Sequence, residues 1–275
     1  GVLFKTQVGE MTVMVKDFKL LSKSLKPLPL PKEDSEGKKY DEFNDPEQRY
    51  RQRYVDLVVN SEVKETFIKR SKIISSIRRF LEKLNFVEVE TPILQPIPGG
   101  AAAKPFVTHH NSLNIPLYMR IANELYLKRL IVGGFDGVFE FAKDFRNEGM
   151  DRTHNPEFTN LEFYVAYKDY NWMMDLTEKL LENTVTELYG KSDVAYGANK
   201  IDFKGPYPRI PILEAIKNET GIDVENLNDI ELSEKAKNIG IEVDSTMGRG
   251  KIIDSIFGDK CESNFIQPTF IIDYP

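Results

Sequence analysis

Two segments whose apolar residues recur at a period of two, separated by a polar loop, constrain the fold of this chain most. Before the loop the apolar positions are Phe139, Phe141 and Phe145, and after it they are Leu161, Phe163 and Val165. Side chains alternate between the two faces of a strand, so both segments are predicted as strands of one hairpin with a shared core face. The opposite face then carries Glu140, Ala142 and Arg146 from the first strand, and Glu162 and Tyr164 from the second.

The predicted hairpin loop collects side chains that suit a nucleotide. It contains Arg146, Glu148, His154, Asn155 and Phe158. A guanidinium can bind a phosphate through two parallel hydrogen bonds, and polar groups can read the edge of a base. The phenyl ring offers a surface on which a base can stack. The sequence therefore predicts nucleotide binding at this hairpin.

The loop also carries a specific family resemblance. Phe-Arg-Asn-Glu-Gly over residues 145–149 and His-Asn-Pro-Glu-Phe-Thr over residues 154–159 resemble motif 2 of the class II aminoacyl-tRNA synthetases, most closely that of the lysyl-tRNA synthetases. The related aspartyl and asparaginyl enzymes typically keep the arginine and Pro-Glu-Phe but not Glu-Gly or His-Asn-Pro. The resemblance implies an α+β fold, in which an antiparallel catalytic sheet is flanked by helices. Motif 2 then covers about residues 139–166.

The same resemblance implies a reaction and roles within it. Such enzymes activate L-lysine with ATP to form lysyl-adenylate and transfer the lysyl group to the 3′ end of tRNA(Lys), with Mg²⁺ as a cofactor. By this likeness Arg146 is the catalytic residue, which bridges the lysine carboxylate and the α-phosphate. Glu148 and Asn155 would bind the adenine and ribose region, Phe158 would stack on the adenine, and His154 would reach the γ-phosphate.

The lysine-binding residues implied by the resemblance come from three segments. Glu162 and Tyr164 would form an acidic, hydrogen-bonding pocket that suits an ammonium group. Gly100 lies in a Gly- and Ala-rich segment, residues 95–106, which cannot be a regular strand and resembles a mobile loop over the amino-acid pocket. Glu124 lies near the start of a helix predicted over 121–130. A carboxylate there can simply favour the helix dipole, but the resemblance assigns it to the substrate α-ammonium.

A helix and strand upstream resemble motif 1, about residues 62–94. Ser61 offers an N-cap, and apolar residues follow at helical spacing up to Leu84. The segment 85–94 is then predicted as an alternating strand that ends at Pro92, the residue at the characteristic position of the class II dimer interface. The family usually has glycine where Asn85 stands, and asparagine also tolerates the left-handed conformation. A helix and strand without a dimer remains the alternative.

The remaining helices and strands are predicted from the spacing of apolar residues and from capping residues and glycines at helix ends. Asn171 is predicted to cap a helix that ends before Gly190, and short helices are predicted over 212–217, 231–236 and 251–257. The last three resemble a helical insertion between motifs 2 and 3, about residues 208–261. Residues 2–15 are predicted as a β-hairpin and residues 266–275 as a hydrophobic strand.

These observations give three predicted domains. Residues 1–30 resemble the end of the OB-fold domain that binds the anticodon, 31–60 form a linker, and 61–275 form the catalytic domain. Motif 3 is absent, and the magnesium ligands are expected beyond Pro275, with none in this chain. We therefore expect these 275 residues alone to be poorly active.

Composition limits the cellular setting and the partners. The net charge of −6 argues against nucleic-acid binding through bulk charge, so contact with RNA would need local basic patches. The single cysteine, Cys261, suits a reducing compartment. No apolar run approaches the roughly 20 residues that cross a bilayer, and no signal peptide is recognised. We expect a cytoplasmic homodimer with no membrane contact.

Two local patterns admit more than one interpretation. Residues 49–54 interleave arginine with tyrosine, which suits either an RNA-facing patch or arginine packing at a domain junction. His109 and His110 suggest a metal site, but adjacent residues point apart on a strand and no cysteine or third histidine supports them. A structural role is the favoured interpretation.

Two other functions compete with lysine–tRNA ligation. A relative with the same core lysylates a protein, as the enzymes that modify elongation factor P do. These enzymes lack the OB domain, so the hairpin at residues 2–15 counts against this reading. A non-catalytic dimerising or RNA-binding module derived from the class II fold is the other alternative, because motif 3 is missing.

Overall fold

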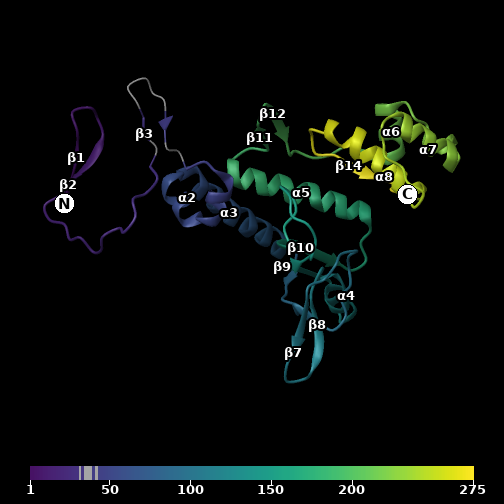
Figure 1. The fold of residues 1–275 in the computed structure, drawn as a ribbon, viewed down its shortest axis with the longest axis horizontal. Coiled ribbons are helices and arrows are strands. Elements are labelled where there is room, and N and C mark those ends of the chain that lie inside the picture. Colours follow the sequence, from purple (N-terminus) through teal and green to yellow (C-terminus); the bar gives the residue numbers. More distant parts are fainter. Residues whose placement is uncertain (31, 34–38, 41–42) are drawn as a thin grey trace. The chain divides into compact units, whose positions relative to one another are not determined.

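The computed structural model of this chain describes residues 1–30, 32–33, 39–40 and 43–275. Part of the predicted linker, at residues 31, 34–38 and 41–42, lies outside the described residues. The chain divides into two compact units, Gly1–Lys69 and Arg70–Pro275. Figure 1 follows the chain from one end to the other. Among the described residues, no helix is both long enough and apolar enough to cross a membrane.

The first unit contains two hairpins and short helices. Strands β1 (Val2–Lys5) and β2 (Met11–Met14) form the predicted hairpin, and β3 (Lys32–Glu33) pairs with β4 (Lys39–Tyr40). Residues 46–59, which the sequence placed in the linker, form helices α1 (Pro46–Arg51) and α2 (Arg53–Val59). Assignment of residues 1–30 to an OB fold remains a prediction.

Two arginines of residues 49–54, Arg49 and Arg53, are paired with a buried aspartate of this unit. Arg49 Nε lies 2.8 Å from Oδ1 of the buried Asp56, and Arg53 binds the other carboxylate oxygen. The Arg53 guanidinium also lies over the Tyr50 ring, 5.1 Å from its centroid. These contacts favour the packing interpretation over an RNA-facing patch.

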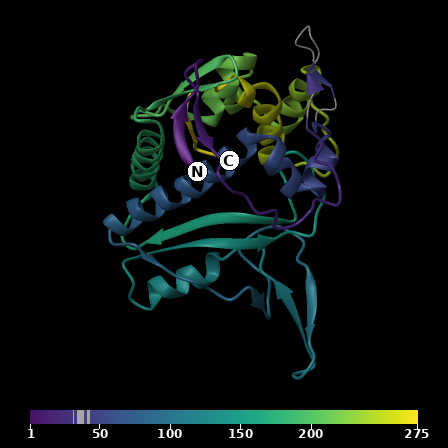
Figure 2. The same cartoon turned by 90° about the vertical axis from the view of Figure 1, so that its left-hand side faces the viewer.

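The second unit is built around a three-stranded sheet in the order β10-β9-β5. Strands β9 (Gly137–Phe145) and β10 (Glu157–Val165) are the two arms of the predicted hairpin, and β5 (Val87–Glu88) runs parallel to β9. Figure 2 shows the part of α3 (Ser61–Lys83) that belongs to this unit, from Arg70 on, on one side of the β9–β10 pair and α4 (Glu124–Val132) on the other. A second sheet joins β6 (Leu94–Gln95), β8 (Ile115–Met119) and β7 (Val107–His110).

The core of the sheet lies on the α3 side. It includes residues from α3, from the strands and from α5 (Tyr170–Tyr189), and its fully or nearly buried members are Leu81, Phe86, Phe139, Leu176 and Leu180. Phe141, Leu161, Phe163 and Val165 pack against them. The predicted core face of the hairpin is therefore confirmed except at Phe145, which is not part of this cluster.

Several predicted elements differ in their limits. The segment expected as one strand over 85–94 is divided between two sheets, because Val87–Glu88 pairs with β9 while Leu94 already belongs to β6 and pairs with β8. Asn85 does adopt the left-handed conformation, with φ of 63°. Helix α5 is capped by Asp169, whose side chain accepts a hydrogen bond from the Trp172 backbone, so the prediction of Asn171 as the cap is wrong. An aspartate two residues earlier supplies the acceptor.

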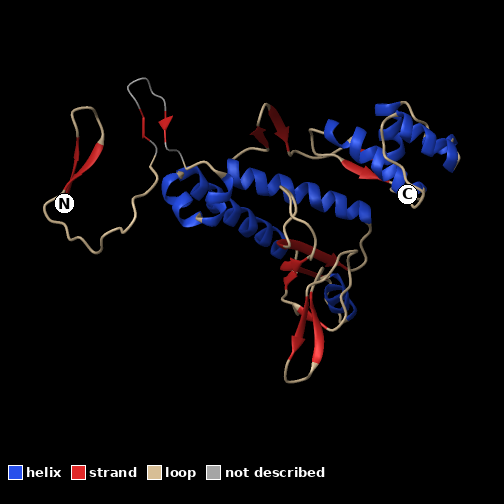
Figure 3. Ribbon diagram, viewed as in Figure 1, coloured by secondary structure: helices blue, strands red, loops and turns tan. Residues whose placement is uncertain are grey.

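The later part of the unit contains the three predicted short helices. They are α6 (Ile212–Thr220), α7 (Asp229–Asn238) and α8 (Arg249–Lys260), coloured as helices in Figure 3. Their shared core includes the buried Cys261. Strand β13 (Arg209–Pro211) precedes them and pairs in parallel with β14 (Phe270–Ile272), which follows them. The three helices thus lie in one insertion between the two paired strands of this sheet. Another hairpin, β11 (Asp193–Tyr196) and β12 (Asn199–Asp202), lies between α5 and β13.

Candidate active site

The register of β9 and β10 fixes which side chains share the polar face. Phe158 lies opposite Asp144, and Glu162 lies opposite Glu140. Because the alternation has a period of two, this face also carries Asn160 and Tyr164 from β10 and continues to Arg146 just after β9. The sequence-predicted placement of Arg146, Glu162 and Tyr164 on one face is confirmed. This face is turned toward α4, away from the apolar core.

Arg146 and Phe158 are in direct contact. The Arg146 guanidinium lies over the phenyl ring, 5.1 Å from its centroid. The Arg146 backbone N–H donates to Pro156 O at 2.8 Å, which closes the loop at its base. The buried Nε has no hydrogen-bond partner, and none of the described residues accepts a hydrogen bond from this guanidinium. Its donors are therefore available for an anionic ligand.

Glu162 and Tyr164 form a hydrogen-bonded pair on the same face. The Tyr164 hydroxyl donates to Glu162 Oε2 at 3.1 Å. Burial raises the pKa of Glu162, and the negative charges of Asp144 and Glu124 raise it further. Burial also raises the pKa of Tyr164, with Glu162 adding to the effect, so the hydroxyl remains a donor at neutral pH. The pocket is therefore acidic and its carboxylates destabilise one another.

Gly100 lies against the start of α4. Its φ is +90°, and a Cβ added there would lie 3.0 Å from Ala122 Cβ and 3.1 Å from Glu124 Cβ. Only glycine fits both the conformation and the space. Glu124 itself pairs with Lys128, with Nζ 2.6 Å from Oε1. The structure thus brings Gly100 and Glu124 together. The negative charge of Glu124 also raises the pKa of Glu162 and of Tyr164, so all three predicted segments contribute to one site.

Glu148 connects the hairpin loop to the Gly- and Ala-rich segment. Its Oε1 accepts a hydrogen bond from the Lys104 backbone at 3.1 Å, and the Asn147 backbone donates to Lys104 O at 2.7 Å. These two bonds hold Lys104 beside the loop between β9 and β10. Glu148 thus has a structural partner in addition to its predicted contact with the nucleotide.

His154, Asn155 and Pro92 make local contacts only. His154 Nδ1 lies 2.8 Å from Asp151 Oδ2. Hydrogen bonds from Thr153 and His154 hold the pKa of Asp151 well below its usual range. The Asn155 amide donates to Glu157 O at 3.0 Å, and Pro92 is exposed. None of these contacts tests the predicted roles, which remain predictions.

A buried polar network beneath the site was not predicted from sequence. Arg120 Nη1 lies 2.8 Å from Glu140 Oε1, and Arg120 Nε lies 3.2 Å from Asp144 Oδ1. Asn123 and Thr91 also donate to Glu140. Period-two alternation placed Glu140 on the polar face and could have placed Asp144 there too. The arrival of Arg120 beside them depends on how the chain returns from the second sheet.

The predicted metal cofactor finds no matching set of ligands in the described part of the chain. No group of three or more His, Cys, Asp or Glu side chains could hold an ion there. His109 contacts Asn114, and His110 Nδ1 lies near Ser112 Oγ and the Leu113 backbone, so both stabilise the turn between β7 and β8.

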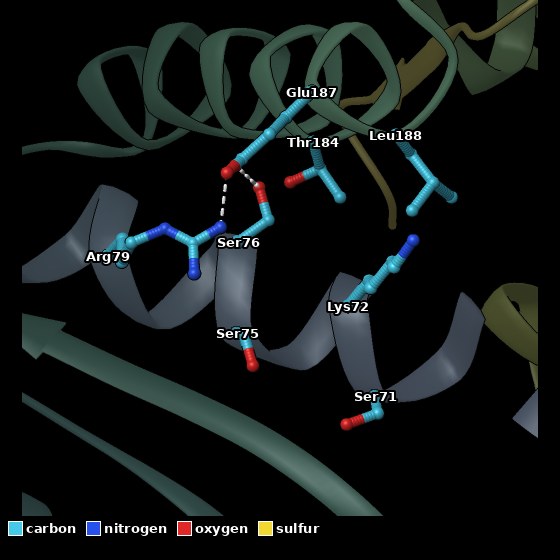
Figure 4. A pocket seen from close by; sticks show the side chains of 8 residues that line it. All are labelled: Ser71, Lys72, Ser75, Ser76, Arg79, Thr184, Glu187 and Leu188. Atoms are coloured by element: carbon cyan, nitrogen blue, oxygen red, sulfur yellow. Dashed lines mark hydrogen bonds and ion pairs between the residues drawn. The ribbon is translucent and has the colours of Figure 1, made fainter. Parts of the chain in front are cut away.

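A pocket of about 420 Å³ lies elsewhere, between α3 and α5 (Figure 4). Glu187 of α5 binds Ser76 and Arg79 of α3 across it. These side chains satisfy one another's hydrogen-bonding groups and connect the two helices. The hairpin face has the unpaired guanidinium and the mutually repelling carboxylates, so we place the candidate active site there and not in this pocket.

Comparison with known proteins finds relatives that cover the whole chain. Residues 45–275 match the family described as tRNA synthetases class II (D, K and N). Over its whole length the chain is 67% identical to a lysine–tRNA ligase of Christiangramia forsetii, and the match covers 48% of that protein. It is also 60% identical to a lysine–tRNA ligase of Porphyromonas gingivalis, with 47% of that protein covered. The identity to a lysine–tRNA ligase of Azobacteroides pseudotrichonymphae is 56%, with 55% of that protein covered. The chain spans about half the length of the curated relatives it matches.

Proposed function

Because this chain belongs to the tRNA synthetases class II (D, K and N), we propose that it carries the amino-acid-activating site of a lysine–tRNA ligase. In the first step a carboxylate oxygen of L-lysine attacks the α-phosphorus of ATP. The new P–O bond forms as the bond to the β-phosphate oxygen breaks, which gives lysyl-adenylate and diphosphate. A ribose hydroxyl at the 3′ end of tRNA(Lys) then attacks the lysyl carbonyl and releases AMP.

The observation that carries this proposal is the unneutralised Glu162–Tyr164 pair. Among the described residues, no lysine or arginine forms an ion pair with Glu162, while Asp144 and Glu124 raise its pKa. A ligand ammonium would relieve this repulsion, and a ligand carboxylate would add to it. A neutral side chain would leave the carboxylate desolvated and unpaired, which disfavours it strongly. The pocket therefore fits an amino acid with a cationic end.

Arg146 supplies the positive charge that the first step needs. The lysine carboxylate and the α-phosphate are both anionic, so their approach is unfavourable without a fixed cation between them. The Arg146 donors are free and lie on the same strand face as Glu162. One end of lysine bound at Glu162 and the other at Arg146 orients the carboxylate for attack and stabilises charge in the transition state.

The remaining residues have supporting roles in the proposal. Phe158 offers its ring to the adenine, with Glu148 and Asn155 at the adenine and ribose and His154 toward the γ-phosphate. Gly100 and Glu124 receive the α-ammonium. Mg²⁺, a homodimer with Pro92 at its interface, and a cytoplasmic location follow from the family resemblance and remain part of the proposal.

Lysine-dependent exchange between ATP and pyrophosphate tests the function, measured on the protein at its full natural length. Arg146→Ala should lower the exchange rate at least ~10²-fold, because a preorganised charge at the transition state is lost. Arg152→Ala, which removes an exposed arginine from the same loop, should leave exchange unchanged. Absence of lysine-dependent exchange in the wild-type protein would favour the non-catalytic module. Transfer of lysine to a protein in place of tRNA would favour the protein lysyltransferase.

A further inference from the structure

Asn160 lies between Phe158 and Glu162 on the polar face of β10. It is directly opposite Ala142, whose methyl group leaves room for the amide to reach diagonally across the strands. The Asn160 Nδ2 atom donates to Asp144 Oδ2 at 3.1 Å and to Glu162 Oε1 at 3.0 Å. An amide nitrogen carries two hydrogens, so both are used, one for each carboxylate.

Asp144 depends on this amide. Its side chain is fully buried, and Oδ1 has no hydrogen-bond partner. Arg120 Nε lies 3.2 Å from Oδ1, but its single hydrogen is donated to Lys143 O at 2.8 Å. Asn160 is therefore the one hydrogen-bond donor to Asp144 among the described residues. Burial raises the pKa of Asp144, as expected for a carboxyl with so few donors.

Glu162 is held at both carboxylate oxygens. Asn160 donates to Oε1, and the Tyr164 hydroxyl donates to Oε2. Two donors on opposite oxygens fix the plane of the carboxylate, which a single bond would leave free to rotate. A free side-chain rotor would have to be ordered when the substrate binds, at a cost in affinity.

The chemical type of the group at position 160 matters as much as its contacts. A lysine or arginine there could also bind both carboxylates, but it would neutralise the charge that the substrate ammonium needs. An amide orients the carboxylate and leaves its charge in place. The neighbouring Asp144 then adds negative potential at Glu162, as the raised Glu162 pKa indicates.

We propose that Asn160 is a positioning residue for amino-acid recognition, which ties Glu162 to the buried Asp144 and so sets the affinity for the cationic end of the substrate. This inference rests on the proposed function, because it takes Glu162 as the group that binds the ammonium. It makes Asn160 and Asp144 determinants of specificity although neither touches the substrate.

Steady-state kinetics of ATP–pyrophosphate exchange on the full-length protein test the positioning role of Asn160. Asn160→Leu keeps a similar volume and removes both donors, so the KM for lysine should rise about tenfold. The KM for ATP should stay within about twofold, because Phe158 and Arg146 are untouched. Asp144→Asn keeps an acceptor for Asn160 but removes the charge, and should raise the lysine KM about threefold. In the double variant the effects should be less than multiplicative, since both act through one contact.

Asn183→Leu is the matched control. Asn183 is a half-buried asparagine of α5 that donates to Ser76 Oγ at 3.5 Å, away from the hairpin face. Its loss should leave both KM values within about twofold, with any fall in melting temperature giving the scale of a purely structural effect.

The outcomes separate the inference from the proposed function. An unchanged lysine KM in an active Asn160→Leu protein would overturn the positioning role, as would an equal rise in the KM values for lysine and ATP. If Asn160→Leu does not fold, an unchanged lysine KM in Asp144→Asn overturns it instead. A wild-type protein that shows no lysine-dependent exchange overturns the proposed function itself, and the substrate assignment with it.

Discussion

Glu140 and Glu162 lie directly opposite each other across the β9–β10 pair, yet only Glu140 is neutralised. Burial alone would raise the pKa of Glu140. Hydrogen bonds from Thr91, Asn123 and Arg120 outweigh burial and hold that pKa below its usual range. Glu162 receives only neutral donors, and its pKa is raised. One strand pair therefore carries a structural carboxylate and a carboxylate ready for a cation.

The Arg120–Glu140 pair predicts a large effect on stability. Arg120→Met leaves Glu140 and Asp144 buried without their cation, so the free energy of unfolding should fall by about 3–5 kcal/mol. Chemical denaturation followed by circular dichroism measures it. Arg120→Met combined with Glu140→Met should be less destabilising than Arg120→Met alone, because it removes one of the two carboxylates left without a cation. A larger loss in the double variant would contradict this account.

The raised pKa of Glu162 predicts how lysine binding depends on pH. The ammonium binds the ionised carboxylate, so affinity should be constant above this pKa and fall as pH drops through it. The fall should begin above the ordinary pKa of 4.5. Tyr164→Phe removes a hydrogen bond that lowers the pKa and should move the inflection to higher pH. Isothermal titration of lysine across pH measures both, and an inflection that moves to lower pH in Tyr164→Phe would count against the assignment.

Gly100 and Gly99 give a matched pair of substitutions. Gly100→Ala puts a Cβ 3.0 Å from Ala122 Cβ at a φ of +90°, so the backbone must shift and the KM for lysine should rise roughly tenfold. Gly99→Ala meets only Leu125 Cδ1, the end of a flexible side chain, and should change the KM less than about twofold. Equal effects of the two substitutions would show that Gly100 has no special position.

Phe158 should affect ATP and not lysine. Phe158→Ala removes the ring on which adenine is proposed to stack, and should raise the KM for ATP about tenfold or more. Phe158→Tyr keeps the ring and should stay close to wild type. The lysine KM should change little in both, which is the reverse of the pattern expected for Asn160→Leu. Exchange kinetics with each substrate varied in turn distinguish the two.

Local pattern predicted much of the hairpin and the family. The alternation of Phe139 and Phe141 with polar residues, and of Leu161 and Phe163 with Glu162 and Tyr164, placed the core face and the polar face correctly. The helix end before Gly190 was also correct, because a glycine that ends a helix acts within one turn. The limits of the segment 85–94 were not, since strand pairing there depends on a distant partner.

The sequence by itself determined which residues share a face, because the periods of strands and helices are properties of the local backbone. It also determined the family, through residues at fixed spacing around Arg146. Only the tertiary structure decided which polar groups neutralise one another. Arg120 and Glu140, which form an ion pair, are 20 residues apart in the chain. Asn160, which also binds Glu162, is 16 residues from Asp144. Such pairings are chosen by the packing of the whole unit, because a buried charge must find its partner wherever the fold brings one.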